Sequence, residues 1–205
     1  QCLTLKQLGA NYAYLANSSN STTSILKSCN VVGVETQFLT NVWGVDEPVI
    51  KASGMAANGI IYAMRTNSIW GDESKGMELL KEVAKYSGKK DSYKSVHYIS
   101  AVCTMFYMAE AMELAIESEN FSGEGMKKAM YQKENWVPRG LEGVCLPSTW
   151  KEDDHRGLMD VPIFKVKVNG STEKKNVNEL MKNKVIELIK VDQIRLPRRP
   201  EWRGY

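Results

Sequence analysis

The chain has 205 residues, of which 43% are hydrophobic and 25% are charged. This composition is typical of a globular protein with a buried core. The formal net charge of +3 is too small, and the lysines and arginines too scattered, to indicate a nucleic-acid-binding protein. The densest basic group, Arg195 to Arg199, lies near the C-terminus, where we expect a solvated tail.

Three short apolar strands are predicted in the first part of the chain, at 12–16, 36–40 and 60–64. Helical segments separate them, and Pro48 suits the first turn of the second of these helices because its missing N–H is not needed there. Strand–helix–strand units of this kind imply parallel strands with helices on both faces of the sheet. We therefore predict an α/β fold with a Rossmann-like parallel sheet and flanking helices.

The second part of the chain has a different pattern. Residues 96–116 are apolar enough to span a bilayer, but they include two glutamates and a histidine, so we expect a buried helix. One face of it is predicted from the spacing of five residues: Ile99, Val102, Phe106, Ala109 and Met112. A shorter helix follows at 123–131, an alternating strand at 161–168, and a helix at 177–189.

The four cysteines form no C-x-x-C pair, so a zinc site is not favoured. Cys103 is interpreted as a small core residue of the long helix. The sequence leaves open whether Cys2 and Cys29 pair.

Acidic and histidine residues give little support for catalysis. Asp153, Asp154 and His155 are consecutive, and neighbouring side chains in an extended segment point in alternate directions, so a hydrogen-bonded turn is favoured over a metal site. The nucleophile elbow and the phosphate-binding loop motifs do not occur. We predict no catalytic residues, no metal and no cofactor.

A binding pocket for a small molecule fits the residues better. In parallel sheets, ligands bind off the carboxyl ends of the strands. The loops there, with one residue of the long helix, supply small polar groups and aromatic walls: Asn17, Ser18, Ser19, Trp43, Trp70 and Tyr98. The alternative is that Trp43 and Trp70 only cover the edge of the sheet.

Six segments, taken in order, resemble the C-terminal half of a known family. They lie at 8–15 (LGANYAYL), 38–47 (FLTNVWGVDE), 53–59 (SGMAANG), 97–111 (HYIS to MAEA), 154–157 (DHRG) and 196–202 (LPRRPEW). The order and spacing resemble type I periplasmic binding proteins, the Leu/Ile/Val-binding family of ABC importers.

The resemblance implies two lobes that close on a ligand. Residues 1–94 would be most of the second lobe, 95–160 would return to the first lobe, and 161–205 would cross back. The opening units of the first lobe would be missing. The first residues of the chain agree with this expectation, because they have the pattern of the middle of a helix and include no signal peptide. The implied partners are a small-molecule ligand, a membrane permease, the missing N-terminal lobe and a second copy of the fragment. The implied location is the periplasm or the outer face of a bacterial membrane.

The resemblance also implies roles for particular residues. Ser18 matches the loop of the second lobe that meets the ligand, and Tyr98 matches a position that lines the side-chain pocket. Amino-acid-binding members place an acidic residue where Val42 or Trp43 stands here, with Asp46 near enough to substitute. We therefore expect a small organic or aromatic acid, or a related amino acid. The alternatives are a ligand-sensing module of a receptor and a small α/β enzyme using Cys145 or Asp154.

Overall fold

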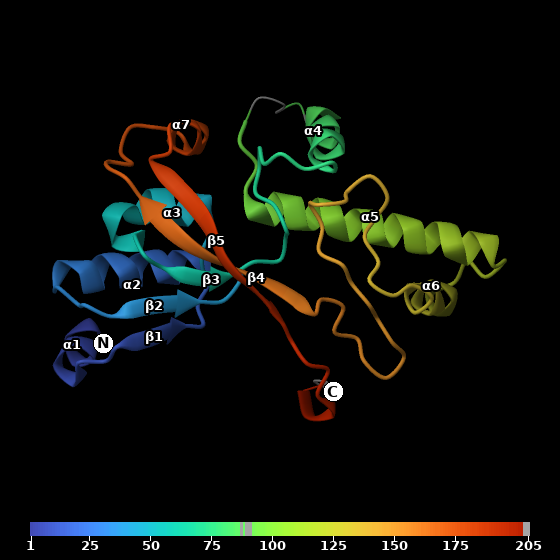
Figure 1. The fold of residues 1–205 in the computed structure, drawn as a ribbon, viewed down its shortest axis with the longest axis horizontal. Helices are drawn as coiled ribbons and strands as arrows, with labels where there is room; N and C mark the ends of the chain where they lie inside the picture. The colour runs from blue at the N-terminus through green and yellow to red at the C-terminus, as the bar shows by residue number, and fades with distance from the viewer. Residues whose placement is uncertain (87, 89–91, 203–205) are drawn as a thin grey trace. The chain divides into compact units, whose positions relative to one another are not determined.

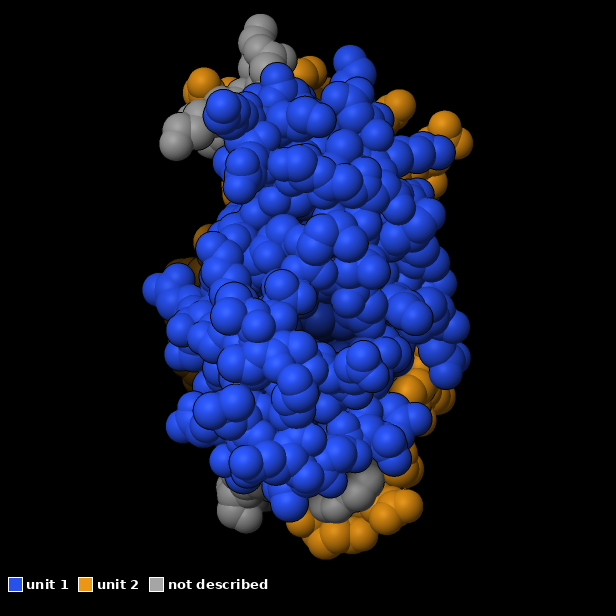
Figure 2. All heavy atoms as spheres, turned by 90° about the vertical axis from the view of Figure 1, so that its left-hand side faces the viewer, with its two compact units in different colours: residues 1–64, 162–192 blue, residues 65–161, 193–205 orange. Residues whose placement is uncertain are grey.

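The computed structural model describes residues 1–86, 88 and 92–202. The chain divides into two compact units (Figure 2). Unit 1 comprises residues 1–64 and 162–192, and unit 2 comprises residues 65–161 and 193–205. The chain therefore passes from one unit to the other after Met64, Val161 and Asp192.

A five-stranded sheet runs in the order β1-β2-β3-β4-β5 (Figure 1). Its strands are β1 (Tyr12–Leu15), β2 (Gln37–Thr40), β3 (Ile61–Ala63), β4 (Asp160–Val168) and β5 (Ile186–Arg195). The first three are parallel, with Tyr12 opposite Gln37 and Leu39 opposite Ile61, which confirms the prediction from the strand–helix rhythm. β4 is antiparallel to β3.

The helices of unit 1 begin and end where the sequence gives local signals. They are α1 (Cys2–Leu8), α2 (Ser19–Val31), α3 (Glu47–Ser53), the 3-10 helix η1 (Gly54–Ala57) and α7 (Val177–Lys182). Asp46 caps α3, and Pro48 stands in its first turn, as predicted. Leu26 of α2, Ile50 of α3 and Tyr62 of β3 are among the buried residues of this unit.

The prediction of a helix over 177–189 was correct only for its first part and wrong for the rest. A capping box of Asn176 and Glu179 starts α7, and the helix ends at Lys182. Lys184 has φ 53°, which breaks the helical conformation. From Ile186 the chain is a strand with Ile186 and Leu188 buried in alternation, because β4 offers an edge to pair with.

Unit 2 is mainly helical. It contains α4 (Met77–Tyr86), α5 (Val96–Glu117), α6 (Gly123–Met130) and the 3-10 helix η2 (Pro200–Trp202). Residues of α4, α5 and α6 share a core with the irregular segment that follows α6. Among the described residues, α5 alone is long and apolar enough to cross a membrane.

The buried face of α5 differs from the predicted stripe. Ile99 and Val102 are buried as expected, but Ala109 is exposed and Met112 is 38% exposed. Phe106 is partly buried. The buried set also includes Tyr107, Glu110 and four smaller residues: Val96, Cys103, Ala111 and Ala115. The reason is that Glu110 is buried with hydrogen-bonding partners, which a hydrophobic pattern does not register.

All four cysteines are paired. Cys2–Cys29 joins α1 to α2 in unit 1, and Cys103–Cys145 joins α5 to the irregular segment in unit 2. Cys103 is a buried core residue, as predicted, and it is also one half of a disulfide, which the sequence did not indicate. The sequence spacing carries no sign of either pair, because both depend on how distant segments pack.

Candidate ligand-binding site

The loops that follow β1 and β2 meet in unit 1. The hydroxyl of Ser19, the first residue of α2, donates to the carbonyl of Trp43 at 3.1 Å. The hydroxyl of Thr40 at the end of β2 donates to the carbonyl of Leu15 at the end of β1, 2.9 Å away. The structure thus brings together the two loops that the sequence predicts for the ligand site.

Gly44 makes this close approach possible. A Cβ atom at this position would lie 2.0 Å from Thr40 Oγ1 and 3.2 Å from the carbonyl oxygen of Asn17. No other residue fits without moving the loops apart. The sequence analysis did not single out Gly44, although a glycine in a loop close behind a strand is a signal of close backbone approach.

Trp43 is held at the surface of this loop. Its backbone N–H donates to Asn41 Oδ1 at 3.0 Å, in a local turn of the kind that asparagine favours. Its side chain remains 55% exposed. Part of the residue is therefore accessible at the surface of this loop.

Ser18 is the N-cap residue of α2, but its hydroxyl makes no capping hydrogen bond. It is exposed, beside the helix N-terminus, where backbone N–H groups carry partial positive charge. Asn17 is partly buried and also lines a cavity of about 460 Å³ next to the Cys2–Cys29 disulfide. These groups together present hydrogen-bond donors suited to an anion.

Asp46 serves the helix that follows. Its Oδ1 accepts the backbone N–H of Val49 at 2.9 Å, which caps α3. The next residue, Glu47, is 0% exposed. Burial, with the charges of Glu47 and Asp46, raises the pKa of the Tyr62 phenol well above its ordinary value. Glu47 is a buried carboxylate in the first turn of α3.

Tyr98, the remaining predicted site residue, belongs to unit 2. Its ring meets that of Trp70 edge to face, with centroids 6.4 Å apart. The ammonium of Lys94 lies 5.6 Å from the centre of the Tyr98 ring. The two predicted aromatic residues of this unit are therefore in contact with each other and packed against its core.

Asp154 is a structural residue. Lys151 and Asp154 pair across a turn, as expected. Its carboxylate accepts hydrogen bonds from Arg156 at 2.8 and 2.9 Å and from Arg198 Nη1 at 2.7 Å. Arg198 is thus an ion-pair partner within unit 2 and an exception to the expected solvated tail, whose other residues, 195–197 and 199, are exposed. His155 lies 2.7 Å from the hydroxyl of Tyr131 and stacks on its ring.

The described part of the chain holds no group of three or more His, Cys, Asp or Glu side chains able to bind a metal. Cys145, the candidate nucleophile of the enzyme alternative, is 2% exposed and oxidised in a disulfide. A thiolate is the reactive form of cysteine, so Cys145 does not serve as a nucleophile in this state.

In this unit, the loops at the carboxyl ends of parallel strands bring backbone N–H donors at a helix N-terminus next to an aromatic ring. Such an arrangement is typical of α/β ligand-binding proteins. A sequence model described as periplasmic binding protein matches residues 1–174, and the chain belongs to that family. This confirms the resemblance to type I periplasmic binding proteins. The family is one of solute-binding proteins, with periplasmic or extracellular members.

Solved structures share the fold at low sequence identity. A branched-chain amino acid ABC transporter protein from Thermus thermophilus with bound valine has 17% identity and a TM-score of 0.73, covering 96% of this chain and 48% of its own. An ABC transporter substrate-binding protein from Aeropyrum pernix has 17% identity and a TM-score of 0.74, covering 98% and 48%. A fatty acid ABC transporter substrate-binding protein from Thermomonospora curvata has 15% identity and a TM-score of 0.70, covering 93% and 45%.

The chain therefore spans about half the length of the structures that it resembles. A comparison with curated proteins found no match.

Proposed function

We propose that the chain is part of the extracytoplasmic solute-binding component of an ABC importer, and that it binds a small organic solute without transforming it. The observation that carries this proposal is the hydrogen bond from Ser19 to the carbonyl of Trp43. It fixes an exposed aromatic ring beside the N-terminus of α2, at the carboxyl ends of parallel strands, in a member of a solute-binding family.

The chemistry of these loops favours an organic acid or amide with an apolar or aromatic body. The N-terminus of α2 and the free hydroxyl of Ser18 suit a carboxylate. The ring of Trp43 offers a face for stacking, worth about 0.5–1.5 kcal/mol beyond area burial. An ammonium group away from water needs a carboxylate partner, and the carboxylate of Asp46 already caps α3.

The solved structures support this range of ligands. One of them holds valine, and another is a fatty acid ABC transporter substrate-binding protein; a fatty acid carries no ammonium group. We infer that the fold accommodates an acid whether or not it carries an amino group. The choice for this chain then rests on Trp43 and its neighbours.

The arrangement into lobes is part of the proposal. By the family resemblance, residues 1–94 supply most of a second lobe, 95–160 return to the first, and 161–205 cross back. Tyr98 would then line the ligand from the first lobe. The chain passes between the two compact units of the structure after Met64, Val161 and Asp192. The lobe boundaries are a separate division of the chain and stay a prediction.

We propose that the remainder of the full-length protein packs on the exposed apolar side of α5. That side consists of Met105, Met108, Met112 and Ile116, which are 65%, 37%, 38% and 59% exposed. Contiguous apolar surface of this kind marks an interaction site in soluble proteins. Without the remainder of the protein, a second copy of the chain would cover it, giving a dimer. The membrane permease is the proposed partner of the complete protein.

An oxidising compartment is also proposed. Two disulfides, one in each unit, persist in periplasmic or extracellular proteins and are rare in the cytosol. They agree with the compartment in which members of this family work.

A thermal-shift panel on the full-length protein tests the function. We expect stabilisation by aromatic and other apolar carboxylic acids, lost in Trp43→Ala, with leucine and valine giving smaller shifts. Choline belongs in the panel because tryptophan can also hold a cation. Tyr86→Ala, at an aromatic residue of α4 that is 93% exposed and lies outside these loops, is the matched control and should keep the response. Stabilisation by leucine that Asp46→Ala abolishes would contradict the ligand class.

A further inference from the structure

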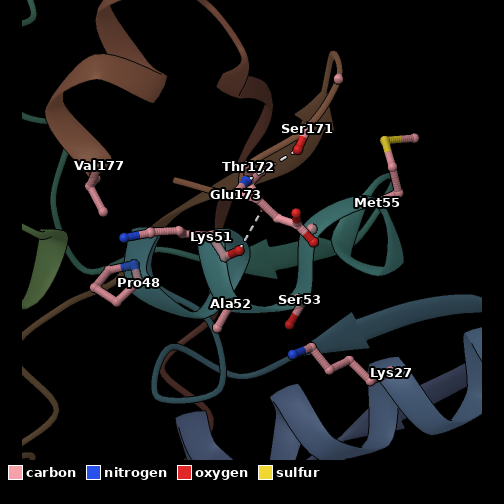
Figure 3. A pocket seen from close by; sticks show the side chains of 12 residues that line it. Lys27, Pro48, Lys51, Ala52, Ser53, Met55, Ser171, Thr172, Glu173 and Val177 are labelled. Atoms are coloured by element: carbon pink, nitrogen blue, oxygen red, sulfur yellow. Dashed lines mark hydrogen bonds between the residues drawn. The ribbon is translucent and has the colours of Figure 1, made fainter. Parts of the chain in front are cut away.

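Unit 1 contains a second cavity, of about 980 Å³, away from the loops described above. It is lined by α3, from Pro48 in its first turn to Ser53 at its end, by η1, by Lys27 of α2 and by the segment 170–177 (Figure 3). α3 begins in the loop after β2 and η1 leads into β3, so the C-terminal end of α3 lies toward the amino ends of the strands. The predicted ligand loops are at the opposite, carboxyl ends.

Ser53, one of the residues that line this cavity, has a hydroxyl group without a hydrogen-bond partner. The residue is 6% exposed, and its hydroxyl oxygen has no hydrogen-bond partner. A serine in a helical conformation commonly donates to the carbonyl four residues earlier, and Ser53 does not. Native proteins rarely leave a buried hydroxyl unpaired unless water or a ligand completes it. The hydroxyl is therefore a donor that a polar ligand atom would complete, once the side chains that shield it from solvent make room.

The charged side chains around Ser53 indicate which kind of chemical group would bind there. Figure 3 shows the hydroxyl of Ser53 and the ammonium of Lys27 pointing toward each other, from α3 and α2 respectively. Two donors at one spot match the two oxygens of a carboxylate. The cavity also contains Lys51 and a single carboxylate, that of Glu173, so its lining carries a net positive charge.

The wall that carries Glu173 is fixed in place. Thr172, only 6% exposed, donates its hydroxyl to the carbonyl of Lys51 at 2.8 Å, which fastens the segment to α3. Gly54 has φ 58°, and a Cβ atom there would meet Thr172 Oγ1 at 3.4 Å. The Glu173 side chain extends along this wall into the cavity (Figure 3). Its carboxylate accepts hydrogen bonds and repels a second negative charge.

We propose that this cavity binds a small hydroxycarboxylate anion. Lys27 and Ser53 hold the carboxylate, and Glu173 accepts the hydrogen bond of the ligand hydroxyl. A monoanion matches the net positive lining, whereas the phosphate dianion would bring a second negative charge toward the carboxylate of Glu173. This site is independent of the solute site proposed at Trp43.

Calorimetric titration of the full-length protein with lactate, propionate and inorganic phosphate tests the site. Lactate and propionate differ only in the hydroxyl group. We expect lactate to bind with a dissociation constant on the order of 1 mM, propionate about fivefold more weakly, and phosphate not measurably. Ser53→Ala and Lys27→Met should each weaken lactate binding about tenfold, and Glu173→Ala should remove the preference over propionate.

Controls separate binding from folding. Ser53→Ala removes an unpaired buried hydroxyl, so its melting temperature should stay at or above that of the wild type, and a loss of binding then reports on the site. Ser28→Ala and Lys165→Met, both at exposed positions, should bind lactate like the wild type. The proposal is overturned if lactate does not bind, if Ser53→Ala and Lys27→Met bind it normally, or if phosphate binds more tightly than lactate.

Discussion

Trp136 donates its indole N–H to Glu110 Oε2 at 2.7 Å inside unit 2. The other carboxylate oxygen accepts the backbone N–H of Arg139 at 2.5 Å, and Lys133 lies 3.3 Å away. Glu110 thus connects α5 to the irregular segment after α6, with its side chain 7% exposed. The helix α5 is apolar enough to resemble a membrane span, yet the carboxylate of Glu110 within it is buried and accepts hydrogen bonds from the segment packed against it.

Replacing Glu110 should therefore be costly. Glu110→Ala leaves the indole N–H of Trp136 buried without an acceptor, at about 1–3 kcal/mol, and removes the acceptor of the part-buried N–H of Arg139 as well. We expect the free energy of unfolding to fall by about 3 kcal/mol, measured by urea denaturation. Glu113→Ala, one turn later with a side chain that is 56% exposed, should cost less than about 1 kcal/mol. Equal losses in the two variants would contradict the role of Glu110.

Asp154 should make stability depend on pH in the acid range. The hydrogen bonds from Arg156, opposed by burial and aided by Arg198, hold the pKa of Asp154 well below its ordinary value. A carboxylate with a lowered folded-state pKa stabilises the fold above its unfolded pKa of about 3.9, and this contribution is lost as the pH falls further.

The comparison of Asp154→Asn with the wild type isolates that contribution. We expect the stability difference between them to be constant from pH 7 to about 5 and to shrink as the pH falls toward 2. The exposed neighbour Asp153 supplies the control, and Asp153→Asn should follow the wild-type curve. A difference that grows on acidification would reverse the assigned sign. Urea midpoints at each pH provide the measurement.

The two disulfides should be present in the purified protein and should stabilise it. Peptide mapping without reduction should recover Cys2 linked to Cys29 and Cys103 linked to Cys145. The Cys103–Cys145 bond spans a sequence separation of 42 residues, and loop-closure entropy gives about 4 kcal/mol for a loop of this length. The double variant Cys103→Ala, Cys145→Ala should unfold at correspondingly lower urea concentration. Recovery of a free thiol at Cys145 would reopen a reactive role for it.

Asp46 offers a test of the loop after β2. Asp46→Ala removes the cap of α3 and should lower the free energy of unfolding by about 1 kcal/mol. Asp46→Asn keeps a capping oxygen and should retain most of the stability. Both variants should bind the preferred organic acid like the wild type. A loss of binding in Asp46→Asn at unchanged stability would show that the carboxylate serves the ligand.

The 205-residue chain should not bind the solute tightly by itself. It spans about half the length of the related structures, so one wall of a two-lobed site leaves the ligand partly in water. Calorimetry with the acid that stabilises the full-length protein best should give an affinity weaker than micromolar. Micromolar or tighter binding would show that residues 1–205 contain the whole site.

The sequence predicted the parallel part of the sheet because its signals are local. Each of the three strands is a short apolar run between a helix and a polar turn, and Asp46 with Pro48 marks a helix start. Val177 to Ile189 misled because its apolar residues satisfy both helical and strand spacing. Only the neighbouring strand β4, provided by tertiary structure, decides that Ile186 and Leu188 lie in a strand.

The site residues divide in the same way. The meeting of the Asn17–Ser19 and Trp43 loops followed from parallel topology, because strand ends at one edge bring their loops together. Gly44 and Glu47 were missed, since close backbone approach and the burial of a carboxylate depend on atoms from other segments. Ser53 was missed for the same reason. A buried hydroxyl without a partner has no sequence signature.

The antiparallel pairing of β3 with β4 has a consequence for biosynthesis. Ile61 pairs with Lys165, so one side of β3 has no strand beside it until the polypeptide has been made through β4. At about 5–20 residues per second, that interval lasts on the order of 5–20 s on the ribosome. Throughout it, the backbone groups on this side of β3 are available to chaperones or to the strands of other nascent chains. A chain that stops before Pro162 keeps this edge open permanently, which predicts aggregation of such translation products.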